Sequence, residues 1–157
     1  MEWSLTAFLF TLGVCLASLI VAGATERKRK DDKEWFANLK HPDNAFLLKA
    51  LYVVGFIFFP MFGFILYTAF VASDIVSIVL ATSVIVIMGF SPLLKYKTRN
   101  LSLFFYVMLV LPVITIALII FLFQTNIVSA ILAIVFMLWL VYDLSYYYRL
   151  MKLNKAL

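Results

Sequence analysis

The stretch that decides the fold runs from Asn100 to Tyr142 and reads NLSLFFYVMLVLPVITIALIIFLFQTNIVSAILAIVFMLWLVY, without a single charged residue. A helix needs about 20 apolar residues to cross the hydrocarbon core of a bilayer. This stretch is too long for one crossing and suits two, with a break at its most polar point, residues 124–126. We therefore expect two membrane-spanning helices, at about 101–123 and 127–148.

Three more apolar runs precede this stretch, at about 3–25, 50–73 and 75–94, and a polar loop, 26–49, separates the first two runs. Of the 157 residues, 66% are hydrophobic and only 13% are charged, whereas a soluble domain is roughly half apolar and about a quarter charged. So much apolar surface must face lipid. The sequence predicts an all-α polytopic membrane protein, a bundle of five transmembrane helices that forms a single domain over residues 1–157.

The positions of the cations predict how the chain is oriented. The 13 Lys and Arg residues fall into three groups, at 27–49, at 95–99 and at 149–155. With five spans all three groups lie on one side of the membrane, whereas four spans would place some on opposite sides. Because cytoplasmic loops carry the excess of Lys and Arg, we expect the C-terminus in the cytoplasm and the N-terminus outside. The expected location is the plasma membrane of a prokaryote.

The polar loop contains a short amphipathic segment. Trp35, Phe36 and Leu39 fall on one face at helical spacing, and Pro42 ends any helix there. Such a segment can lie on the membrane surface or fold over the inner end of the bundle as a lid. His41, the one histidine of the sequence, is expected to be exposed in this loop.

The residue types disfavour an enzyme and a metal site. Cys15 is the one cysteine, and no pair of His, Cys or carboxylate residues has metal-ligand spacing. We therefore expect no catalytic residue, no metal and no cofactor. The basic cluster after the first span is mixed with acids, so we read it as a topology signal, with no nucleic acid as a partner.

Asp143 is the most informative charge, because it follows Tyr142 near the inner end of the fifth span. An acid inside a span should face the bundle or a wet cavity and not lipid. Two interpretations stay open. The carboxylate could bond to a tyrosine or pair with a loop cation, or it could contact a ligand or an ion.

The first span carries small residues at four-residue spacing, Gly13 with Ala17 and Ser18 with Ala22. Such pairs let helix backbones approach closely. They predict either packing within one bundle or the face of a homodimer.

Three stretches of the chain resemble one family. The loop motif Trp35-Phe36-x-x-Leu39-x-His41-Pro42 is similar in spacing to a W-Y-x-x-L-x-K-P motif. The second span has Leu51-Tyr52 followed by Gly55, and the fifth has Trp139 followed by Leu153-Asn154. On these residues the chain resembles the TspO/MBR family of translocator proteins and tryptophan-rich sensory proteins, which have five transmembrane helices in about this length.

The resemblance implies a pocket for a porphyrin, a sterol or a drug-like ligand within the bundle, and binding or transport of that ligand. The implied ligand-binding residues are Trp35, Phe36, Leu39 and Pro42 at the lid, and Tyr52, Trp139, Tyr142 and Asp143 in the wall. The chain also departs from the family, because tryptophans expected in the second span are missing and Ile87-Met88-Gly89 replaces polar positions. The ligand can therefore differ even where the fold is kept.

Two other functions compete with this one. A non-catalytic accessory subunit of a larger membrane complex would have the same short loops and small-residue faces. An enzyme acting on a lipid or a porphyrin is the weakest alternative, because acid–base residues are nearly absent. We expect membrane lipid, a hydrophobic small molecule such as a tetrapyrrole, and a second copy of the chain as partners.

Overall fold

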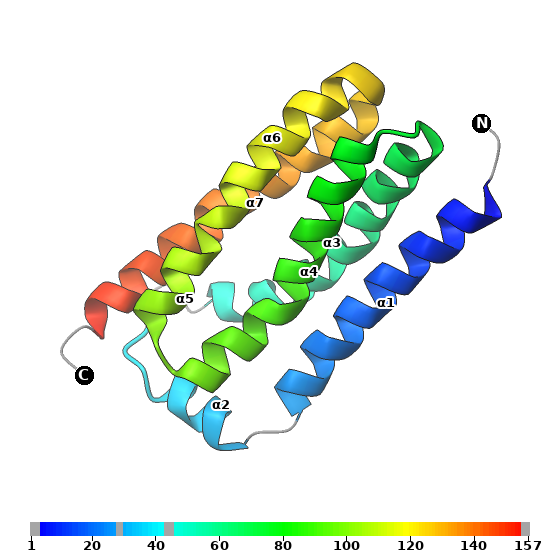
Figure 1. Cartoon of the computed structure of the whole chain (residues 1–157). Coiled ribbons are helices and arrows are strands. Elements are labelled where there is room, and N and C mark those ends of the chain that lie inside the picture. The colour runs from blue at the N-terminus through cyan, green and yellow to red at the C-terminus, as the bar shows by residue number, and fades with distance from the viewer. Residues whose placement is uncertain (1–3, 28–29, 43–45, 155–157) are drawn as a thin grey trace.

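The structure is a computed structural model that describes residues 4–27, 30–42 and 46–154, with the backbone alone for 25–27, 30, 32–33 and 46–56. Within these residues all regular secondary structure is helical, as the all-α prediction requires. Figure 1 shows the long helices side by side. The helices are α1 (Leu5–Arg27), α2 (Lys30–Ala37), α3 (Phe46–Val71), α4 (Ile75–Thr98), α5 (Leu101–Met108), α6 (Val110–Thr125) and α7 (Ile127–Leu153).

Four helical stretches of the described chain are long and apolar enough to cross a membrane: Leu5–Ala24, Ile75–Thr98, Leu101–Thr125 and Ile127–Leu153. The described side chains of α3 add a shorter apolar stretch, Ile57–Val71. Four of the five predicted crossings therefore meet this criterion.

Three polar residues mark where helices begin. The side-chain oxygens of Asp74, Asn100 and Asn126 accept hydrogen bonds from backbone N–H groups three residues later, at 3.1, 2.9 and 3.1 Å. Each such cap satisfies a donor that the first turn of a helix leaves unpaired. These caps separate the long apolar stretches into individual helices.

The predicted helix over residues 101–123 is interrupted in the structure. α5 ends at Met108, and α6 begins at Val110 and contains Pro112. Proline has no N–H group to donate to the carbonyl four residues earlier, and its ring crowds that carbonyl. The interruption at Leu109 lies in the turn preceding this proline, which explains its position.

The two ends of the bundle differ in charge. α1 packs against α3 and α4, α3 packs also against α7, and α6 packs against α4 and α7. One end, which we call the basic end, contains α2, the C-terminal ends of α4 and α7, and the start of α5 (Figure 1). The turns from α3 to α4 and from α6 to α7 lie at the other end. The described Lys and Arg side chains are Lys40, Lys95, Lys97, Arg99, Arg149 and Lys152, all in segments of the basic end.

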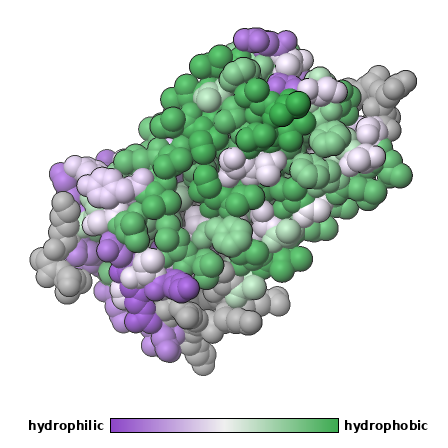
Figure 2. Space-filling view, in the orientation of Figure 1, coloured by the Kyte–Doolittle hydropathy of each residue, from purple (hydrophilic) through white to green (hydrophobic). Residues whose placement is uncertain are grey.

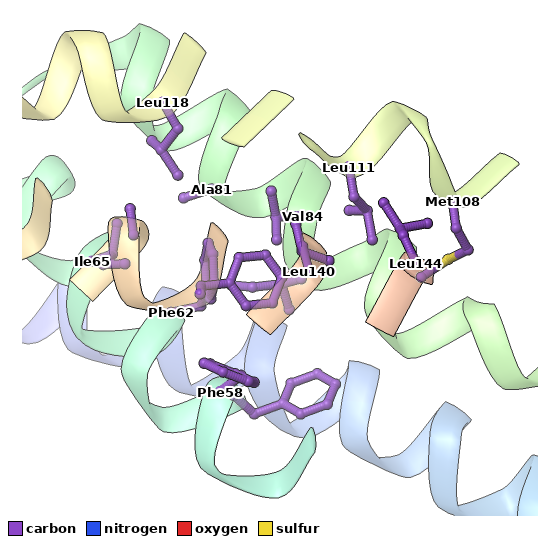
Figure 3. Close-up of a cluster of buried hydrophobic side chains, with 14 of the residues drawn as sticks. Phe58, Phe62, Ile65, Ala81, Val84, Met108, Leu111, Leu118, Leu140 and Leu144 are labelled. Carbon is purple, nitrogen blue, oxygen red and sulfur yellow. The ribbon is translucent and has the colours of Figure 1, made fainter. Parts of the chain in front are cut away.

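Apolar side chains fill the space between α3, α4, α6 and α7. Figure 3 shows Phe58, Phe62 and Ile65 of α3 in one cluster with Ala81 and Val84 of α4, Leu118 of α6 and Leu140 of α7. The Phe62 and Phe136 rings lie 4.7 Å apart, and the Phe58 and Phe136 rings 4.9 Å apart. This part of the interior is packed by side chains.

The outer surface of the bundle is apolar along its length. Large hydrophobic residues such as Ile120, Leu138 and Val141 are more than half exposed. Figure 2 shows the hydrophobic surface extending along the helices, with hydrophilic residues gathered at the ends, most densely near α2. In water this surface would be costly, so it must face lipid.

Candidate functional site

The loop that follows α2 is held against the end of α7 by one side chain. The Asn154 Oδ1 atom accepts a hydrogen bond from the Lys40 N–H group at 2.9 Å, and its Nδ2 atom donates to the Lys40 carbonyl at 3.0 Å. Nδ2 also donates to the Leu150 carbonyl at 2.8 Å, which fixes the orientation of the amide. Asn154 is buried. This two-way contact holds the loop across the basic end.

His41 provides a second attachment of the loop and is half-buried, so the prediction that it is exposed was wrong. Its Nε2 atom lies 2.9 Å from the Phe36 carbonyl, and its Nδ1 atom lies 2.9 Å from the Tyr146 hydroxyl. Because a carbonyl can only accept, Nε2 carries a proton and donates to Phe36, and Nδ1 shares a hydrogen bond with the Tyr146 hydroxyl. Folding of the loop onto α7 partly buries the histidine.

Phe36 covers a buried lysine of α4. The Lys95 Nζ atom lies 4.6 Å from the Phe36 ring centroid, 4.6 Å from that of Tyr96 and 5.8 Å from that of Tyr147. Nζ also donates to the Tyr147 hydroxyl at 3.4 Å. Only 8% of Lys95 is exposed. Aromatic faces attract a cation, so we call Phe36, Lys95, Tyr96 and Tyr147 the lysine cage.

Asp143 lies one turn before Tyr147 on α7 and is likewise only 8% exposed. Its carboxylate interacts electrostatically with Lys95. Its Oδ1 atom is buried and has no hydrogen-bond partner among the described residues. Such an atom is costly unless a donor reaches it. The expectation that this acid faces the bundle agrees with its burial.

The aromatic residues predicted on α7 lie in a separate cluster. The Trp139 ring is 6.1 Å from the Phe58 ring and 5.6 Å from the Tyr142 ring. Trp139 is half-buried, whereas Tyr142 is exposed at the bundle surface. Pro42 is half-buried in the loop, and the side chain of Tyr52 lies outside the described residues.

A groove of about 640 Å³ opens at the basic end, between α2, the α4–α5 connection and the end of α7. Trp35 and Leu39 line it, whereas the Phe36 ring lies against Lys95. The described lining consists of Trp35, Asn38, Leu39, Thr98, Arg99, Asn100, Leu101, Ser102, Met151 and Asn154.

The structure therefore divides the predicted site residues into three groups. Phe36 and Asp143 are linked through Lys95, Trp35 and Leu39 belong to the groove, and Trp139 pairs with Tyr142. Lys95 was not among the predicted site residues, because its charge was interpreted only as a topology signal. The available signal was its position between Leu94 and Tyr96. Among the described residues no group of three or more His, Cys, Asp or Glu side chains could hold a metal ion.

Comparison with known proteins gives one finding about identity. The sequence matches the model of the TspO/MBR family over residues 10–152, nearly the whole chain. This range includes the α2 loop, the lysine cage and Asp143. A search of curated proteins with this sequence found no match. The helical bundle with its apolar surface is thus that of an integral membrane protein, and the chain belongs to the TspO/MBR family.

Proposed function

We propose that this chain binds or transports a flat hydrophobic small molecule of the tetrapyrrole or sterol type, within the bundle near its basic end. Family membership supports a membrane protein that binds or transports a ligand. The proposed binding residues are four of those predicted from the sequence, since Trp35 and Leu39 line the separate groove. Phe36 belongs to the lid, and Asp143, Trp139 and Tyr52 belong to the wall.

The observation that carries the proposal is the buried Oδ1 atom of Asp143, which has no partner within the described chain. It lies one helical turn from both Trp139 and Tyr147 on α7. A ligand with an O–H or N–H donor would satisfy this oxygen, and aromatic rings suit a flat apolar body. Sterol hydroxyls and pyrrole N–H groups have this chemistry.

The membrane arrangement is part of the same proposal. α3 provides the fifth crossing, because its helix extends from Phe46 to Val71. The whole chain then forms a single transmembrane domain with the basic end in the cytoplasm, as the distribution of Lys and Arg favours. The membrane is the plasma membrane of a prokaryote.

The test is a tryptophan-fluorescence titration of the detergent-purified protein with protoporphyrin. Saturable quenching at one ligand per chain is expected. Trp139→Phe should weaken binding, while Trp3→Phe serves as the control because Trp3 is not a proposed site residue. Asp143→Asn, which keeps the shape of the side chain, should also weaken binding. Linear quenching that none of the three substitutions changes would mean partition into the micelle and would refute a tetrapyrrole ligand.

A second candidate function, that of an accessory subunit, is favoured by one face of α1. Gly13 and Ala17 are exposed, and a Cβ atom added at Gly13 would meet nothing within 4 Å. This face could receive a helix of another subunit or of a second copy. Ser18, in contrast, is buried against Gly89 of α4. Copurification of another protein at fixed stoichiometry would favour the accessory role, and a purified dimer of this chain would favour the homodimer.

A further inference from the structure

The groove at the basic end has the composition of a lipid site. Leu39, Leu101 and Met151 give it apolar surface, and Trp35 adds an indole ring. Asn38 and Ser102 also line it, and their side chains make no hydrogen bond within the described part of the chain. A volume of about 640 Å³ lies within the range of ligand sites.

Arg99 brings positive charge to the lining of the groove. Arg99 is the one charged residue among the described residues that line it. Lys97 and Thr98 precede Arg99 at the end of α4, and the backbone of Arg99 is left-handed, with φ at 48°, where α4 passes into α5. A cation in a groove with both polar and apolar lining residues suits a ligand with an anionic head and an apolar body.

The groove also lies at the boundary between the apolar surface of the bundle and its polar basic end. It is bounded on one side by the first turn of α5, where the apolar stretch Leu101–Thr125 begins. On the other side lie α2 and the polar basic end (Figures 1 and 2). This boundary is where lipid headgroups meet a membrane protein, and basic residues there attract anionic lipids.

We infer that this groove binds an anionic phospholipid, with the phosphate near Arg99, Asn38 and Ser102 and the acyl chains along Leu101 and Met151. The bound lipid contacts Trp35 of α2 and both ends of the connection between α4 and α5. It is a separate site from the proposed interior ligand site, because Phe36 and Asp143 do not line the groove. The inference therefore does not depend on what the interior binds.

The experiment uses full-length protein with Trp35 as the single tryptophan, Trp3→Phe/Trp139→Phe, in phosphatidylcholine vesicles. Equal mole fractions of phosphatidylglycerol or phosphatidylcholine brominated near the glycerol backbone are added. Bromine quenches an indole only at contact range. We expect the brominated phosphatidylglycerol to quench Trp35 at lower mole fractions. Arg99→Gln should reduce this preference about fivefold, the effect of one basic residue near an anionic surface.

Lys97→Gln is the matched control. Lys97 lies two residues before Arg99 and carries the same charge, but its exposed side chain does not line the groove. It should leave the preference within about twofold of the unsubstituted value. Ser102→Phe fills the groove without changing charge and should abolish the preference. It decides the question if Arg99→Gln fails to fold. Equal quenching by both lipids, or equal losses in the Arg99 and Lys97 variants, would overturn the site, since the latter indicates only diffuse surface charge.

Discussion

At the scale of single residues, Lys95 shows how a charge is held inside an apolar helix end. Its ammonium group contacts the rings of Phe36 and Tyr96 at 4.6 Å and the hydroxyl of Tyr147 at 3.4 Å. The positive charge of Lys95 also acts on the buried carboxyl group of Asp143. These partners come from α2, α4 and α7, so a single side chain links three helices at the basic end.

We expect Lys95→Met to destabilise the protein by about 1–3 kcal/mol, because the variant loses the contacts of the ammonium group with the Phe36 and Tyr96 rings and its hydrogen bond to Tyr147. It also loses the positive charge that acts on the buried Asp143 carboxyl group, so adding Asp143→Asn should restore part of the loss. Thermal unfolding in detergent measures both. A double variant as unstable as the single one would show that Lys95 does not compensate the Asp143 charge.

The loop contact of Asn154 makes a second prediction at this scale. Asn154→Ala removes its hydrogen bonds to Lys40 and Leu150 and should cost about 1–2 kcal/mol. The loop should then open, so that trypsin cleaves after Lys40 faster than in the unsubstituted protein, as mass spectrometry of the fragments would show. Asn38→Ala is the matched control, because the Asn38 amide makes no hydrogen bond within the described residues. Equal cleavage rates in both variants would exclude a role for Asn154 in closing the loop.

At the scale of helices, the sequence predicted more of the membrane-spanning elements than of the loop. Uncharged runs and the polar residues Asn100 and Asn126 locate helices without any tertiary information. The loop was harder, because Leu39 was assigned to the same helical face as Trp35 and Phe36. α2 in fact ends at Ala37, so helical spacing no longer applies to Leu39. The direction of each side chain then depends on contacts with α4 and α7, which no local pattern contains.

The packing of α1 on α4 depends on Gly89. A Cβ atom added there would lie 2.8 Å from the Ser18 Cβ atom and 3.0 Å from the Ser18 carbonyl oxygen. Because the backbone of α1 would have to move, Gly89→Ala should cost about 1–3 kcal/mol. Gly13→Ala is the control, since its methyl group would meet nothing within 4 Å, and its stability should be unchanged or slightly raised. Similar melting temperatures for both variants would contradict this close contact.

At the scale of the whole molecule, the sequence predicted that charged residues and apolar surface are separated. It did not predict which side chains contact one another inside the bundle. Counting Lys and Arg along the chain places them at one end, and the structure has the described ones in segments of that end. No count could reveal that Lys95 turns inward while Lys97 is exposed. That difference arises from the position of each residue around α4 and from the rings of Phe36 and Tyr147 that surround only Lys95.

The proposed orientation is tested with single cysteines in a Cys15→Ser background. Ala72→Cys lies in the α3–α4 turn, and Thr98→Cys lies at the basic end; both positions are exposed. In intact bacterial cells a membrane-impermeant maleimide should label residue 72 and should reach residue 98 only after permeabilisation. The reverse pattern would place the basic end outside.

The contact between Lys40 and Asn154 has a consequence for how the protein is made. The two residues are 114 positions apart, and translation at about 5–20 residues per second separates their synthesis by about 6–23 s. The long helices from α3 to α7 are therefore synthesised before the first loop can be fastened. Until residue 154 has been synthesised, Asn154 cannot hold the loop against the end of α7. The loop is thus fastened at the basic end only after these helices have been made.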